Sequence, residues 1–168
     1  MLQTPVRVIQ TLRPKVATGV LTATAVSTIV FSATPFLVRG VAVDQGVDVS
    51  TVGVISTAQL AGFSLTTWAA GRYLRARRRM LVIAVLLGAA ANLASGWAPS
   101  FSILVGTRVV SGVSLGLIAW IAWAEAFGDK EKVGDVAVIG PIVGIVSAPI
   151  IASVVDRSGS DALFYGLA

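Results

Sequence analysis

Long uncharged stretches alternate with short charged intervals along the whole chain. A helix rises about 1.5 Å per residue, so about 20 apolar residues cross a hydrocarbon core of roughly 30 Å. Each of the five stretches is close to this length. The uncharged runs are residues 16–38, 49–71, 80–107, 109–124 and 136–155. From them we predict an all-α integral membrane protein, a single membrane domain over residues 1–168, with helices at about 16–38, 50–71, 80–98, 101–126 and 136–155.

A further apolar segment closes the sequence. Residues 160–168 predict the start of a sixth transmembrane helix, long enough to reach only about a third of the way across a bilayer. We therefore expect the chain to hold five transmembrane helices and part of another.

Composition supports a membrane location and argues against catalysis. Only 12% of the residues are charged, and the mean hydropathy is +0.86, so a water-facing surface cannot be assembled. The chain has no cysteine and no histidine, which removes thiol chemistry, imidazole catalysis and the common transition-metal ligands. Glu125 is the only acidic residue inside the five predicted spans, and no nucleophile–base pair is visible. We expect no enzyme activity, no cofactor and no metal site.

The basic residues indicate an orientation. If the chain weaves back and forth, ten of the thirteen fall on one side and only Arg39 and Arg157 on the other, while Arg108 lies inside a span. Cytoplasmic loops are rich in lysine and arginine, so we predict a multi-pass protein of the cytoplasmic membrane with its N-terminus in the cytoplasm. The net charge of +5 then reflects topology and anionic lipid headgroups, and we expect the lipid bilayer, not nucleic acid, as partner. The ten residues on the predicted cytoplasmic side are Arg7, Arg13, Lys15, Arg72, Arg75, Arg77, Arg78, Arg79, Lys130 and Lys132.

Arg108 is the most informative single residue. It lies seven residues inside the fourth span, where an arginine costs at least about 2.5–3.5 kcal/mol on insertion scales. One interpretation is that its long side chain reaches back to the interface. The other is that it faces the interior and binds an anionic substrate or couples proton movement. Glu125 lies roughly 25 Å further along the same helix, so any counter-charge must come from another helix or another part of the protein.

Polar side chains within the spans suggest a cavity. The first span is rich in threonine and serine, although such hydroxyls also bond to their own helix. Our candidates for cavity-lining residues are Thr24, Thr28, Gln59 and Trp120. We expect the first, second and fourth spans to form most of the central face, with the third more peripheral.

Small residues predict close helix packing and bending. Gly112 and Gly116 form a GxxxG element in the fourth span, a spacing that lets helix backbones approach closely. Gly140, Pro141 and Gly144 give a second small-residue spacing in the fifth span, with a proline that bends the helix.

These residues resemble a known family. The segment 104–112 is similar to the L-x-x-x-R-x-x-x-G pattern in the fourth helix of major facilitator superfamily transporters, and Gly140 to Gly144 is similar to the fifth-helix G-P-x-x-G-G element of its antiporters, with Ile145 in place of the last glycine. The loop from Gly71 to Arg79 occupies the place of the family's loop signature, although Arg75 stands where the family has an acidic residue. The resemblance covers the N-terminal half of such a transporter.

The resemblance implies a function and a missing partner. It implies an N-terminal bundle of a twelve-helix secondary transporter, in which proton-coupled efflux of a small molecule involves Arg108 and requires the C-terminal half or a partner subunit. We expect the chain alone not to transport. The alternative is a non-transporting membrane scaffold, or a half-size subunit that must pair with another chain.

Overall fold

The computed structural model describes residues 14–168, apart from the side chains of residues 159–161. Within that part of the chain every regular element is an α-helix, and five helices are long and apolar enough to cross a membrane. The all-helical fold class with five candidate spans is therefore confirmed. The helices are α2 (Thr18–Gln45), α3 (Val49–Tyr73), α4 (Arg78–Gly96), α5 (Phe101–Ala126) and α6 (Lys130–Gly166).

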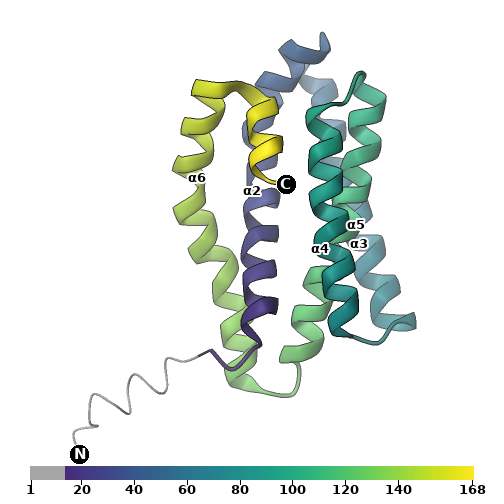
Figure 1. The fold of residues 1–168 in the computed structure, drawn as a ribbon, viewed down its shortest axis with the longest axis vertical. Coiled ribbons are helices and arrows are strands. Elements are labelled where there is room, and N and C mark those ends of the chain that lie inside the picture. Colours follow the sequence, from purple (N-terminus) through teal and green to yellow (C-terminus); the bar gives the residue numbers. More distant parts are fainter. Residues whose placement is uncertain (1–13) are drawn as a thin grey trace, which may run out of the picture.

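The helices run up and down along the long axis of the molecule, each antiparallel to the next in sequence (Figure 1). The starts of α2, α4 and α6 and the ends of α3 and α5 therefore lie together. We call this the basic end, because it carries Lys15, the arginines of Arg72–Arg79, and Lys130 and Lys132. The opposite end carries Arg39 and Arg157, whereas Arg7 and Arg13 lie outside the described residues.

Two helices extend beyond the predicted spans. α2 continues past residue 38 through Arg39 and ends only at Gly46, whose φ of 61° takes the backbone into the left-handed region. α6 starts at Lys130 and not at residue 136, because the Asp129 side chain accepts hydrogen bonds from two first-turn amides. An uncharged run marks the segment that lipid tolerates, whereas a helix continues until a cap or a glycine ends it.

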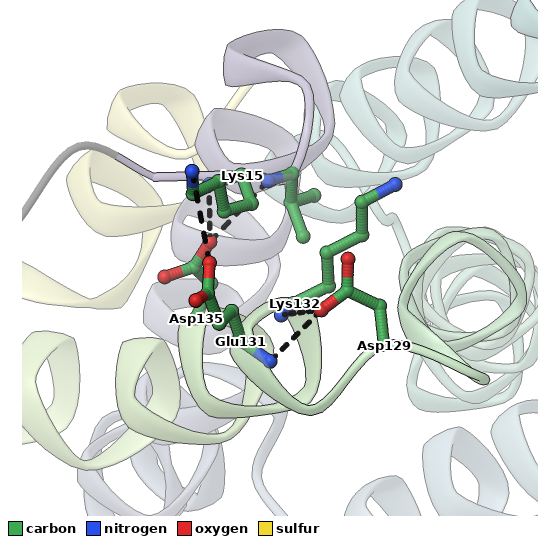
Figure 2. Close-up of polar contacts among 6 residues, drawn as sticks. Lys15, Asp129, Glu131, Lys132 and Asp135 are labelled. Atoms are coloured by element: carbon green, nitrogen blue, oxygen red, sulfur yellow. Dashed lines mark hydrogen bonds and ion pairs between the residues drawn. The ribbon is translucent and has the colours of Figure 1, made fainter. Parts of the chain in front are cut away.

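Carboxylates at the basic end hold the start of α2 (Figure 2). The Lys15 amide donates to Asp135 of α6 at 2.5 Å, and the Lys15 ammonium lies 3.6 Å from the Glu131 carboxylate. The Ala17 amide donates to Glu125 of α5 at 2.8 Å. Because α2 has no side-chain cap of its own, residues of two other helices satisfy amides next to its start.

The last residues turn back beside α4. Tyr165 donates to the carbonyl of Gly96 at 2.9 Å, and Asn92, one turn nearer the basic end, donates to the carbonyl of Leu167 at 2.9 Å. The chain therefore descends antiparallel to α4, as the ribbon shows (Figure 1). Residues 160–166 belong to α6, in the part that runs back beside α4, and the start of a sixth helix at residue 160 stays a prediction. A straight α6 would be about 55 Å long, far longer than a hydrocarbon core of roughly 30 Å.

Glycines bring α3 and α5 into backbone contact. A Cβ on Gly112 would overlap the carbonyl oxygen of Gln59, and one on Gly116 would overlap that of Phe63. From the other side, a Cβ on Gly62 would overlap the carbonyl oxygen of Val109. Close backbone approach through small residues is the usual way in which membrane helices pack. It fixes the rotation of α5, and with it the direction of Arg108, one turn from Gly112.

Candidate functional site

Arg108 lies inside the helix bundle. Its side chain is 1% exposed, although it lies seven residues inside the apolar helix α5. A charged group at such depth is strongly disfavoured unless polar neighbours surround it. The surroundings of this guanidinium therefore define the candidate site.

Within the described part of the chain, the guanidinium donates its hydrogen bonds to α4. Its Nη2 donates to Asn92 Oδ1 at 2.9 Å, to Ser95 Oγ at 2.5 Å and to the Ala91 carbonyl at 3.4 Å. All three acceptors are uncharged. We expected this span to be peripheral, but α4 supplies every acceptor because its polar face is turned toward α5. The site thus solvates the cation with dipoles.

The end of α6 covers the guanidinium. The Phe164 ring lies under it, with the Arg108 Cζ 4.9 Å from the ring centroid, a cation–π contact that strengthens when water is excluded. Phe164 itself is 1% exposed. Asn92 of α4 connects Arg108 of α5 to the end of the chain, because its side chain accepts a hydrogen bond from Arg108 and donates one to the Leu167 carbonyl.

Two buried donors in the bundle interior lack partners. Among the described residues, Arg108 Nε and Gln59 Nε2 are buried without a hydrogen-bond acceptor. The side-chain oxygen of Gln59, Oε1, accepts a hydrogen bond from the Thr34 hydroxyl of α2 at 3.0 Å. The side-chain nitrogen of Gln59 is left without an acceptor. An unpaired buried donor is costly, by about 1–3 kcal/mol. The polar interior therefore has unused capacity to bind an acceptor.

A cavity of about 410 Å³ lies beside this network, between α2, α4, α5 and the last two residues. Asn92 belongs both to its wall and to the Arg108 network. Most of the wall is apolar, with hydroxyls at intervals. The polar side chains in the wall are Thr18, Thr22, Ser27, Asn92, Ser111 and Ser114. Such a wall suits an amphipathic small molecule.

Thr24 and Thr28 line a second, smaller cavity of about 220 Å³ between α2, α3 and α5. Their hydroxyls donate to carbonyls of their own helix, at 2.8 Å and 2.9 Å. Each hydroxyl therefore offers a bound molecule only its acceptor lone pairs.

The other two cavity candidates lie elsewhere. Gln59 is 1% exposed and packs between α2 and α3. Trp120 packs near the basic end against a cluster of buried residues that includes Ile121, and its ring lies 3.9 Å from the Cβ position of Gly71. Trp120 therefore contributes to packing between α5 and the end of α3.

The remaining candidates show no common site. Gly140 has open space around it and Pro141 is exposed on α6, whereas Gly144 lies 3.9 Å from Ser32 Oγ of α2. Arg75 in the loop between α3 and α4 is exposed at the basic end, and so is Arg79 in the first turn of α4. Pro141 and Pro149 both lie within α6.

Sequence analysis missed the partners of Arg108. Asn92 and Ser95 are buried and three residues apart on α4, a spacing that puts both on one helix face. Two polar residues at that spacing in an apolar span were a usable signal. Phe164 gave no such signal, because its contact depends on how the reversed end of α6 packs against α5.

Compared with known protein families, curated proteins and solved structures, the chain gives no match. The fold and composition define the class: an all-helical, multi-pass membrane protein with five candidate spans.

Proposed function

We propose that this chain is one bundle of a secondary transporter of the major facilitator type, whose N-terminal half its sequence resembles. The observation that carries the proposal is Arg108, which is buried in a candidate span with uncharged acceptors and an unpaired Nε. A non-transporting scaffold gains nothing from this arrangement, whereas a coupling site needs a charge whose partner changes during the cycle.

The cavity beside Asn92 supports the same proposal. The cavity has a volume of about 410 Å³, and its wall combines apolar surface with hydroxyls. Asn92 connects this wall to the guanidinium. In this proposal a small amphipathic molecule passes along the cavity, and proton movement is coupled to it through Arg108. The path is enclosed by a second bundle, either the other half of a longer protein or a second copy.

The scaffold alternative is supported by the glycine-mediated packing of α3 on α5. Such packing stabilises many membrane bundles irrespective of function. It does not account for a buried cation, so the behaviour of Arg108 separates the two functions.

Flux measurements test the proposal. Liposomes loaded with the pH dye pyranine and containing this chain receive ethidium or fluorescein under a pH gradient. A monomer should give no saturable flux, because one wall of the path is absent. Robust saturable flux from a monomer would overturn the half-transporter proposal, while flux from dimers alone indicates a self-assembling pair.

Arg108 variants test the coupling role where a second bundle completes the path. Arg108→Ala should abolish pH-driven flux, and Arg108→Lys should restore little, because an ammonium lacks the planar fork that lies over Phe164. Arg39→Ala, which changes an exposed arginine, is the matched control and should retain flux. Retention of pH-driven flux by Arg108→Ala would contradict the role.

A further inference from the structure

A second hollow opens at the basic end of the bundle. It has a volume of about 580 Å³ and lies between the start of α2, the loop before α4 and the end of α5. Two consecutive arginines, Arg77 and Arg78, line it. The apolar part of the wall includes Val20, Leu81 and Ile121.

The charge of this hollow is positive. Glu125 also lines it, but its Oε1 already accepts the Ala17 amide at 2.8 Å. Two exposed arginines and one carboxylate therefore line the hollow, which leaves a net positive charge. No side chain caps the start of α4, where Arg77 is the N-cap residue, so the local dipole adds to the attraction for an anion.

The other arginines of the segment differ. Arg72 lies over the Trp68 ring, with its Cζ 5.1 Å from the ring centroid. Arg75 is exposed in the loop, and neither residue belongs to the wall of the hollow. Of the five arginines in the segment, Arg77 and Arg78 line the hollow, whereas Arg72, Arg75 and Arg79 do not.

We propose that the hollow binds one anionic phospholipid from the leaflet at the basic end. Guanidinium forks match phosphate oxygens in geometry and charge. The phosphate would lie on Arg77 and Arg78, and an acyl chain would follow the apolar wall past Leu81 toward the hydrocarbon core. A basic pocket between membrane helices at the headgroup level is a suitable site for such a lipid. This inference does not depend on transport.

Native mass spectrometry of the full chain in detergent tests the proposal. With equimolar phosphatidylglycerol and phosphatidylcholine, the chain should retain one phosphatidylglycerol in preference. At about 1 kcal/mol per arginine, Arg77→Gln with Arg78→Gln should weaken binding about 25-fold. Arg72→Gln with Arg75→Gln removes the same charge from the same segment and should change binding less than about twofold.

Three outcomes would overturn the proposal. Equal losses in the two double variants would mean diffuse attraction to the whole segment. No preference for phosphatidylglycerol in the unmodified chain would remove the site. Displacement of the lipid by an equal concentration of inorganic phosphate would mean an anion site without lipid specificity. Circular dichroism monitors folding; if the first double variant loses helicity, the single variants, each expected to weaken binding about fivefold, decide.

Discussion

At Arg108 a cation is buried in an apolar bundle and held by uncharged groups from a neighbouring helix. One nitrogen makes all of its hydrogen bonds, to Asn92, Ser95 and the Ala91 carbonyl. The charge is thus stabilised by dipoles and by the Phe164 ring, and the arrangement depends on the exact rotation of α4 against α5.

We predict that Asn92→Ala destabilises the bundle by about 1–3 kcal/mol, because it removes an acceptor of a buried charge and a donor to Leu167. Thermal unfolding in detergent measures the effect. Thr57→Ala is the control, since the exposed Thr57 hydroxyl only donates to its own helix, and it should change stability by less than about 0.5 kcal/mol. Similar effects of both variants would show that Asn92 does not stabilise Arg108.

The position of Arg108 within a span could be predicted from the sequence, because a charge interrupts a long apolar run. Its acceptors could not be assigned. They lie 13 to 17 residues away on another helix, and their facing depends on helix rotation, which hydropathy does not encode. In soluble proteins a helix turns its apolar face to the core and its polar face to water. In lipid both faces are apolar, so the sequence does not show which face meets another helix.

Among the helices, the α3–α5 pair is the closest and is built on glycine. Gly112 and Gly116 were predicted to mediate close packing, and a Cβ at either would overlap the α3 backbone. Gly106, on the same helix, has nothing within 4 Å of its Cβ position. Gly106 can therefore serve as the control for substitutions at Gly112, because both glycines lie on α5 and only Gly112 is packed against α3.

We predict that Gly112→Ala destabilises the bundle by about 1–3 kcal/mol through overpacking against the Gln59 carbonyl. Gly106→Ala should be neutral or stabilising by up to about 1 kcal/mol, because alanine favours the helix. Unfolding in mixed detergent micelles compares the two. If both substitutions stabilise, α3 and α5 are not in backbone contact.

Helix ends were less predictable than helix centres. The uncharged runs located all five candidate spans, but α2 continues to Gln45 and α6 begins at Lys130. Both extensions contain charged residues, and capping by Asp129 and the conformation of Gly46 decide where the helices begin or end. The reversal within α6 falls between the predicted fifth span, which ends at residue 155, and the predicted start of a sixth helix at residue 160.

For the whole molecule, the distribution of basic residues gives an orientation. The start of α2, the arginines of Arg72–Arg79 and Lys130 lie at the same end of the bundle (Figure 1). We predict that this end faces the cytoplasm. Reporter fusions after Arg79 should give a cytoplasmic signal, and fusions after Trp97 an external one. A periplasmic signal after Arg79 would reverse the topology.

The central claim is that the bundle contains a path that water and substrate can enter, and cysteine accessibility tests it most directly. The chain has no cysteine, so one introduced thiol is the only target. Ser27 lines both cavities between the helices, whereas Ile145 is 76% exposed on the outer surface of α6, which we expect to face lipid. A thiol must ionise in water to react with a membrane-impermeant maleimide.

We predict that the maleimide labels Ser27→Cys in intact membranes and does not label Ile145→Cys. If Ser27→Cys stays unlabelled in membranes but reacts after detergent solubilisation, the bundle contains no such path.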